Sequence, residues 1–287
     1  MNKVKIGIIG RGFVGSAVAN GFSSNTGFDS DIKIYDKDPS KSLNNLDETV
    51  NKSDFIFLSL PTPSNKDGSI SLSILEESLN EINEINENTN NILLLRSTVV
   101  PGTSQKFQKK YKNIRIVFNP EFLTERSAFF DFINQSRIIL GGDPENVKKV
   151  ANLYHNRFGN HLPIIKTNYE TAELIKYMNN CFFATKVSFL NEMKIIADSV
   201  GANWTEAVEG FILDGRIGHS HLNVPGHDGK LGFGGSCFPK DIQALISFAK
   251  NIDIDLNTLE GAWKTNLKVR PEKDWEDLKG RSIVDTD

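Results

Sequence analysis

The chain has 287 residues, which exceeds the usual size of one domain and predicts two. Apolar residues make up 39% and charged residues 24%, as in a soluble globular protein, and no stretch approaches the ~18 apolar residues of a membrane span. A formal charge of -3 without a basic run excludes bulk attraction to nucleic acid or to a membrane surface, and the two cysteines, in unrelated contexts, favour a reducing, cytoplasmic compartment over a disulfide framework.

The first predicted element is a buried strand over residues 4–9, followed by a glycine-rich turn. This GRGFVG turn leads into a helix-like segment, which is the context that a dinucleotide-binding fingerprint requires; the alternative is a glycine turn of another α/β protein. Asp36 ends the next apolar strand, where an acid accepts hydrogen bonds from the adenosine ribose and repels a 2′-phosphate. NAD is therefore favoured over NADP. The pattern thus predicts a dinucleotide-binding turn over residues 10–15, with Asp36 as the acid at the ribose.

Strands and helices alternate through the rest of the N-terminal half. This alternation predicts a Rossmann-like α/β domain over residues 1–167, a doubly wound parallel sheet with helices on both faces. Polar residues follow three of the predicted strands, at Thr62, Thr98 and Glu125. Each alone is typical of a turn or cap, but their recurrence at strand ends favours a shared ligand cleft. The further strands are predicted over residues 55–60, 92–95, 114–118, 137–140 and 162–166.

The second half of the chain is helical in pattern. Residues 169–200 contain no proline or glycine and predict one long helix. Its apolar positions cover more than one stripe, so we expect several packing partners, including a second subunit in a homodimer. Lys176 and Asn180 lie four apart and share a face of this helix. The alternative for Lys176 is a surface ion pair with Glu173, and Cys181 is expected in the core.

A polar loop over residues 214–229 follows, and it contains three histidines. Their HxH spacing without a cysteine or carboxylate pattern is weak, so no metal site is predicted from His219, His221 and His227. Arg216 at the start of the loop suits a phosphate or carboxylate group, because its guanidinium is a fixed fork of donors.

The strongest chemical signal is the stretch GFGGSCFPKD, residues 232–241. Its glycines let the backbone bend and approach a ligand closely, and Pro239 predicts that a helix begins near it. Cys237 then lies at the positive end of this helix, beside Lys240 and one turn from Asp241, in a setting that favours the thiolate. Cys237 is therefore predicted to be a nucleophile; the alternative is a buried cysteine after a glycine turn.

Through its motifs the chain resembles the UDP-glucose/GDP-mannose dehydrogenase family over residues 1–270. The motifs are GRGFVG, LPTP, RSTVVPG, NPEFLTE, SRIILGG, ETAELIKYMNN, DGRIG and GFGGSCFPKD. GGSCFPKD favours the glucose or mannose branch over the N-acetylhexosamine dehydrogenases, whose segment is closer to GGHCIPVD. The resemblance implies NAD-dependent oxidation of the C6 alcohol of a nucleotide sugar to the carboxylate, with two NAD⁺ and one water consumed. UDP-glucose is the implied substrate, and GDP-mannose is the alternative.

The resemblance also implies a role for six residues in this reaction. Cys237 attacks the intermediate aldehyde, and the thiohemiacetal loses a second hydride to give a thioester that water hydrolyses. Asp241 and Lys176 handle the alcohol proton and stabilise the oxyanion. Asn180 is implied to hold a sugar oxygen, and Thr98 is implied to hold the catalytic water. Glu125 is implied to act in thioester hydrolysis.

The binding contacts that the resemblance implies come from both halves of the chain. Cofactor contacts are implied for Gly10, Gly12, Phe13, Val14, Gly15, Asp36, Lys41, Thr62, Ser97, Thr98, Glu125 and Lys240. Substrate contacts are implied for Glu121, Phe122, Leu123, Thr124, Glu125, Lys176, Asn180, Arg216, Phe233, Gly234 and Cys237.

The chain departs from the family pattern in two places. Residues 168–270 are expected to form the helical central and dimerisation domain, and residues 271–287 a tail at the point where a third, nucleotide-binding domain would start. The loop over residues 219–231 is longer than expected and either replaces lost nucleotide contacts or covers the cleft. Two other functions therefore stay open. One is a module that binds NAD or a nucleotide sugar without turnover, and the other is a two-electron β-hydroxyacid-type dehydrogenase, which does not need Cys237.

Overall fold

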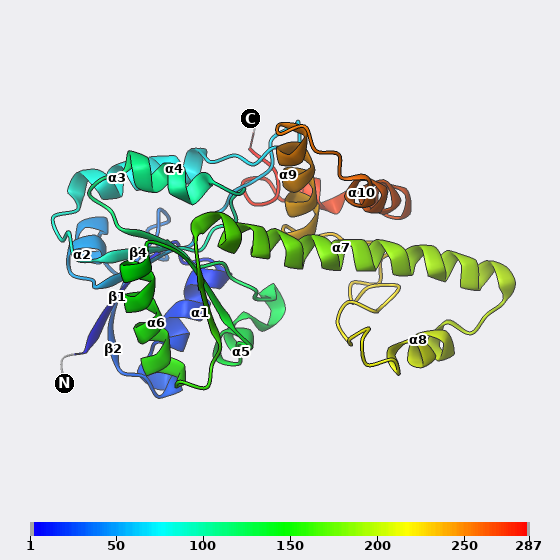
Figure 1. The fold of residues 1–287 in the computed structure, drawn as a ribbon, viewed down its shortest axis with the longest axis horizontal. Coiled ribbons are helices and arrows are strands. Elements are labelled where there is room, and N and C mark those ends of the chain that lie inside the picture. Colours follow the sequence, from blue (N-terminus) through cyan, green and yellow to red (C-terminus); the bar gives the residue numbers. More distant parts are fainter. Residues whose placement is uncertain (1–2, 286–287) are drawn as a thin grey trace. The chain divides into compact units, whose positions relative to one another are not determined.

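A computed structural model describes residues 3–285, which divide into two compact units (Figure 1). Unit 1 comprises the described residues up to Thr62 together with Leu72–Lys176, and unit 2 comprises Pro63–Ser71 together with the residues from Tyr177 onward. The division falls inside the long helix α7 (Tyr169–Val200), not ahead of it. The first turns of α7 belong to unit 1 because Tyr169 and Ala172 are buried in its core.

Unit 1 is built on a seven-stranded sheet with the order β2-β1-β3-β4-β5-β6-β7. The chain runs from β1 outward to β2 and then returns to place β3 on the other side of β1, which is the topological switch point of a doubly wound sheet. The predicted Rossmann-like fold class is confirmed. The strands are β1 (Val4–Ile9), β2 (Ser30–Tyr35), β3 (Phe55–Leu58), β4 (Ile92–Leu95), β5 (Ile116–Phe118), β6 (Ile138–Gly142) and β7 (Ile164–Thr167).

The prediction of a fully parallel sheet is wrong at one pairing. β1 to β5 are parallel, but β6 runs antiparallel to β5, with Val117 opposite Gly142 and Phe118 opposite Gly141. β7 is parallel to β6 and shares its reversed direction. The connection between β5 and β6 contains the short helix α5 (Ala128–Ile133), which packs against α1 (Phe13–Gly21). A β6 parallel to β5 would need a connecting element long enough to carry the chain back along the sheet. The six residues of α5 extend only about 9 Å, so β6 runs antiparallel.

Both faces of the sheet are buried, as alternate residues of β4 show. Leu94 contributes to one apolar cluster with Phe22, Phe132 and Tyr154, whereas Leu93 and Leu95 contribute to the other. Figure 1 shows α1, α5 and α6 on one side of the sheet and α2, α3 and α4 on the other. This arrangement leaves the carboxyl ends of the strands for ligands. The remaining helices of unit 1 are α2 (Leu46–Asn51), α3 (Ser73–Ile85), α4 (Thr103–Lys110) and α6 (Pro144–Phe158).

Unit 2 is helical. The predicted helix over residues 169–200 is confirmed as α7, and a helix begins at the Pro239 motif as predicted, with Cys237 as its N-cap residue. The segment Pro63–Ser71 belongs to this unit, because the Ser64 amide donates to the Ser282 carbonyl and the Val284 amide to the Ser64 carbonyl. Within residues 3–285 there is no helix both long and apolar enough to span a membrane. The other helices are α8 (Trp204–Ile212), α9 (Phe238–Lys250) and α10 (Asn257–Val269).

Candidate active site

The turn between β1 and α1 has the backbone that a dinucleotide site needs. Gly10 has φ +89°, and a Cβ there would lie 2.3 Å from the Ser59 carbonyl oxygen. A Cβ on Gly15 would lie 1.9 Å from the Gly10 carbonyl oxygen, so only glycine allows the helix to pack this close to the turn. A Cβ on Gly12 would meet nothing within 4 Å. The open side of the turn is therefore at Gly12, at the start of α1, and it fits the pyrophosphate of NAD.

Asp36 ends β2 beside this turn. Its carboxylate accepts hydrogen bonds from the backbone amide of Arg11, at 2.6 Å, and from that of Asp38, at 2.9 Å. The Arg11 side chain in turn donates to the carbonyl of Lys41, whose ammonium pairs with Asp38. The structure thus brings Asp36 to the glycine turn, which is where a ribose-binding acid is needed. Lys41 is held on the exposed rim of the same loop.

The loops that follow β3 and β4 are bonded to each other. The Ser97 hydroxyl donates to the Leu60 carbonyl at 2.7 Å and accepts from the Leu60 amide at 3.1 Å. The Thr62 hydroxyl donates to the Thr98 carbonyl at 2.9 Å. Two of the three polar strand-end residues, Thr62 and Thr98, are therefore neighbours, as the sequence predicts. Glu125 is exposed on the short 3-10 helix Glu125–Ser127 that follows β5.

Lys176 on α7 is a buried ammonium, not the surface lysine of the alternative reading. It is 3% exposed and donates to the main-chain carbonyl of Glu121 at 2.6 Å and to the Glu121 carboxylate at 3.1 Å. The other Glu121 oxygen accepts from the Leu123 amide at 2.7 Å, and Phe122 places its ring 5.4 Å from the ammonium. The NPEFLTE segment thus surrounds Lys176. No spacing in the sequence indicated that Glu121 is the carboxylate partner of Lys176.

Glu173, one turn before Lys176, holds a different loop. Its carboxylate accepts from the Gly102 amide at 2.6 Å and from the Ser104 amide at 2.7 Å, at the start of α4. Burial raises the pKa of Glu173 to about 7, against the opposing effect of these hydrogen bonds. The first turns of α7 therefore fix the loops after both β4 and β5.

In unit 2 the motif residues gather around Asp241. Asp241 is 1% exposed, and Asn180 donates to one of its carboxylate oxygens at 2.6 Å while the Lys240 ammonium pairs with the other. Cys237 lies one turn earlier, since its carbonyl accepts the first helical hydrogen bond of α9 from the Asp241 amide at 2.8 Å. The Cys237 sulfur is half-buried and lies 3.8 Å from the Ser236 hydroxyl. The structure therefore brings Asn180, Lys240, Asp241 and Cys237 to one end of α9.

The second cysteine has a different environment. Cys181 is buried, and its sulfur lies 3.9 Å from the Asp241 carbonyl. Burial strongly raises the pKa of the Cys181 thiol, with a further contribution from the Asp241 charge, so this thiol stays neutral. Its predicted place in the core is the one observed.

The glycine turn before Cys237 is held from α7 and α10. The Gly232 amide donates to the Asn191 side chain at 3.0 Å, and Phe233 exchanges two hydrogen bonds with the side chain of Asn266. Gly232 and Gly235 both have positive φ, so the turn depends on glycine at these positions. Sequence reasoning did not find Asn191 or Asn266. The available signal was that a turn with exposed backbone amides needs polar partners from neighbouring helices.

Two side chains of the polar loop, the predicted ligand group Arg216 and the histidine His221, have other partners. Arg216 is exposed and forms a bidentate pair with Asp214. His221 stacks on the Phe183 ring with centroids 4.1 Å apart, and burial lowers its pKa. Within residues 3–285, no three His, Cys, Asp or Glu side chains form a metal-binding group.

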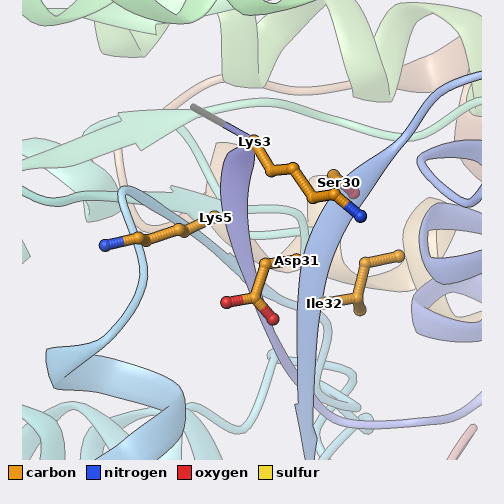
Figure 2. Close-up of a pocket in the computed structure, with 5 residues that line it drawn as sticks. All are labelled: Lys3, Lys5, Ser30, Asp31 and Ile32. Atoms are coloured by element: carbon orange, nitrogen blue, oxygen red, sulfur yellow. The ribbon is translucent and has the colours of Figure 1, made fainter. Parts of the chain in front are cut away.

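A surface hollow lies at the opposite ends of the strands. Figure 2 shows the hollow beside the starts of β1 and β2. Lys3 pairs there with Asp29 and Lys33 with Asp31, so charges that line or flank the hollow are neutralised by neighbours. Ligands of open α/β sheets bind at the carboxyl ends of strands, and we assign no site to the hollow. It is lined by Lys3, Lys5, Ser30, Asp31 and Ile32.

Known proteins match both units. The UDP-glucose/GDP-mannose dehydrogenase family matches through its NAD binding domain over residues 41–158 and through its central domain over residues 170–268. The UDP-glucose 6-dehydrogenase TuaD of Bacillus subtilis is 36% identical over 234 residues, which cover 79% of this chain and 49% of that protein. The UDP-glucose 6-dehydrogenase AglM of Haloferax volcanii is 31% identical over 324 residues, covering 98% of this chain and 74% of that protein.

A solved structure agrees with these matches. The UDP-glucose dehydrogenase of Pyrobaculum islandicum superposes with a TM-score of 0.80 at 26% identity, covering 93% of this chain and 68% of that one. The chain spans about half the length of the Bacillus subtilis relative. The match to an NAD binding domain confirms the expected cofactor. On the sequence match to both domains and the superposition, the chain belongs to the UDP-glucose/GDP-mannose dehydrogenase family.

Proposed function

We propose that the chain is an NAD-dependent nucleotide-sugar 6-dehydrogenase that oxidises the C6 alcohol of UDP-glucose to the carboxylate. The observation that carries this proposal is the cluster at the start of α9, where Cys237 and Asp241 are one helical turn apart along the backbone and the Asp241 carboxylate is buried. The names of the Bacillus subtilis and Haloferax volcanii relatives support UDP-glucose as the substrate. GDP-mannose is the alternative within the same family.

The residues of unit 2 would carry the covalent chemistry. When bound, NAD accepts the hydride that leaves the substrate carbon in each of the two oxidations. Asp241 takes the proton of the C6 hydroxyl as the aldehyde forms. The Cys237 thiolate then adds to the aldehyde carbon, which makes a C–S bond and a thiohemiacetal. Loss of a second hydride gives the thioester, and attack by water breaks the C–S bond, releasing the carboxylate and returning the thiolate.

Lys176 would stabilise negative charge on the reacting oxygen. A buried ammonium acts strongly because little water screens it, and the ion pair with Glu121 holds it in place. We assign Asn180 to the orientation of Asp241 and of a sugar oxygen, because its amide already donates to that carboxylate. Thr98 would hold the hydrolytic water, and Glu125 would act as the base that activates it.

The binding contacts divide between the two units. NAD would lie across the Gly10–Gly15 turn, with Asp36 on its ribose and Thr62, Ser97 and Thr98 near the strand ends. The Lys240 ammonium pairs with Asp241, so we assign it to holding that carboxylate in place as well as to the cofactor contact that the family resemblance implies. The substrate would contact the segment over residues 121–125, Lys176 and Asn180 from the long helix, and Arg216, Phe233 and Gly234 from unit 2.

The deciding experiment measures NADH formed per sugar with UDP-glucose, GDP-mannose and UDP-N-acetylglucosamine. Two NADH per UDP-glucose are expected from the wild type, and Cys237→Ser should stop or stall the reaction, because serine has no thiol and cannot form the thioester. Cys181→Ser is the matched control and should retain turnover, since that thiol is buried and neutral.

Three other outcomes would each replace the proposal. No NADH from any of the three sugars, with NAD still bound, would leave a binding module. One NADH per substrate with no effect of Cys237→Ser would indicate a two-electron dehydrogenase. Faster turnover of GDP-mannose would change the substrate and keep the mechanism.

We also infer a homodimer formed through α7. Apolar side chains along this helix are exposed at intervals of one or two turns, and an unpartnered apolar row of this kind fits a second copy of the same helix. The row comprises Met178, Phe182, Phe189, Ile196 and Val200. A thioester mechanism needs a reduced thiol, so we place the enzyme in the cytoplasm, where Cys237 stays outside a disulfide.

A further inference from the structure

Arg270 is a buried guanidinium that the proposed mechanism does not use. It follows α10 directly and is 2% exposed. Its Nε and one terminal nitrogen donate to the two Asp274 oxygens at 2.8 and 2.6 Å. That terminal nitrogen also donates to Asp228 at 2.7 Å, and the other donates to the Leu231 carbonyl at 3.2 Å. A buried charge bonded this fully is fixed in position.

The guanidinium lies against the glycine turn that leads to Cys237. A Cβ on Gly234 would approach three guanidinium atoms of Arg270, at 2.5, 2.7 and 2.8 Å. Asn266 lies one helical turn before Arg270, and its side-chain oxygen would be 2.4 Å from a Cβ on Gly232. The same oxygen accepts from the Phe233 amide at 2.7 Å. One face of α10 therefore contacts three consecutive residues of the turn, and Cys237 follows three residues later.

Asp228 connects this cluster to the long loop that has no role in the proposed mechanism. The Gly226 amide donates to the Lys230 carbonyl at 2.8 Å, and the Gly229 amide donates to the Gly226 carbonyl at 2.9 Å. These bonds close a compact turn whose tip carries Asp228. The extra residues of this loop thus supply a carboxylate to Arg270, at the point where the glycine turn begins.

We propose that Arg270 is a positioning residue for Cys237, and that the loop over residues 226–230 serves to hold it through Asp228. The inference rests on the proposed function. Arg270 touches neither substrate nor cofactor in this role. It fixes the turn that sets the direction of the Cys237 sulfur, and a small displacement of a nucleophile costs up to about 100-fold in rate.

The test compares Arg270→Lys with wild type in two assays. Lysine keeps the positive charge but lacks the planar set of guanidinium donors, so it cannot bond to Asp228 and to both Asp274 oxygens at once. The kcat should fall by about 10- to 100-fold with the KM for NAD unchanged. Alkylation of Cys237 by iodoacetamide, followed by peptide mass mapping, should become several-fold faster, because the half-buried sulfur gains freedom, while the buried Cys181 stays unmodified.

A lower kcat together with faster alkylation of Cys237 indicates a loss of positioning. General destabilisation would expose Cys181 to alkylation as well. Asp228→Asn should also lower kcat and speed the alkylation of Cys237, by smaller factors than Arg270→Lys. It is the test variant if Arg270→Lys does not fold. Glu260→Gln is the matched control, since it removes an exposed ion pair between α9 and α10. The proposal would be overturned if both Arg270→Lys and Asp228→Asn kept the wild-type kcat and the wild-type rate of Cys237 alkylation. Because alkylation needs no turnover, a failure of the proposed sugar oxidation would be seen separately.

Discussion

Asp241 shows how single residues define the chemistry of this cluster. Its carboxylate is almost completely buried, yet both of its oxygens have donors, an amide from Asn180 and an ammonium from Lys240. A buried carboxylate with such partners has its charge compensated and its position fixed. The neutral amide of Asn180 matters here, since it donates without adding a second negative charge.

Replacing Asn180 by aspartate is expected to make folding stability depend on pH. Two carboxylates at this distance cannot both ionise at low cost, so the folded-state pKa of one rises above its unfolded value. The contribution of this carboxylate pair to folding stability is fully present at acid pH and is lost as pH rises. The melting temperature of Asn180→Asp, relative to wild type, should therefore decrease between about pH 5 and about pH 8. The melting temperature of Asn180→Ala should differ from that of wild type by the same amount at every pH. The prediction would be contradicted if the melting temperatures of all three proteins changed with pH in parallel.

Glu173 provides a second pH-dependent contribution to stability. Its folded-state pKa of about 7 exceeds the ordinary value of 4.5, so the folded protein binds more protons between these values. Stability from Glu173 is present below 4.5 and is lost as pH rises through 7, by about 3 kcal/mol. Glu173→Gln should remove this slope, as measured by urea unfolding across the range. Glu170→Gln on the same helix should keep most of it, because the Glu170 charge is only the smallest cause of the raised pKa. An unchanged slope in Glu173→Gln would contradict the assignment.

At the scale of elements, the β1–α1 turn separates two uses of glycine. Gly15 is required by packing, because any Cβ would collide with the Gly10 carbonyl. Gly12 faces open space, so the fold does not require it, and we propose that the cofactor does. Motif matching treats both glycines as equivalent members of one fingerprint, and only their surroundings distinguish them.

The two glycines should therefore respond differently to the same change. Gly15→Ala is expected to destabilise the fold by roughly 2–4 kcal/mol, seen as a lower melting temperature. Gly12→Ala should leave the melting temperature near that of wild type but weaken NAD binding by about 10-fold or more, because a methyl group occupies the pyrophosphate approach. Calorimetric titration with NAD measures this loss. Unchanged affinity in Gly12→Ala would mean that the cofactor does not bind at this turn.

Sequence patterns predicted those elements whose residues carry a local signal. The Val4–Ile9 strand, the glycine turn and the α7 helix each follow from apolar periodicity and helix breakers within a short window. The reversed direction of β6 carries no such signal, because it depends on where α5 packs. The partners Glu121 of Lys176 and Asn266 of Phe233 are likewise separated from them by many residues, so only the folded chain brings them together.

At the scale of the whole molecule, residues with proposed roles occur in each of the two units. Unit 1 carries the glycine turn, Asp36 and Lys176, and unit 2 carries Asn180, Cys237 and Asp241. The boundary inside α7 was not predictable from sequence, since the helix is continuous through it. Lys176 and Asn180 are one turn apart on this helix, so the division between units falls between two residues of one proposed mechanism.

The exposed apolar row of α7 leads to a prediction about assembly. Phe182 is 63% exposed in the single chain, and a charge there would be buried without a partner if two α7 helices meet. Phe182→Glu is expected to shift the protein from dimer to monomer, measured by sedimentation velocity. Phe130→Glu on α5 is the matched control, because Phe130 is 69% exposed but lies outside the row. A Phe182→Glu dimer of wild-type affinity would exclude α7 as the interface.

The excursion of Pro63–Ser71 out of unit 1 has a consequence for how the protein can be divided. The chain passes between the units after Thr62, again after Ser71 and again after Lys176. No single cut can therefore release either unit as a continuous chain, and a gene fragment that begins at Tyr177 would lack the Ser64 backbone to which Ser282 and Val284 bond. Recombination that exchanges one unit for another would have to replace two separate stretches of the gene together.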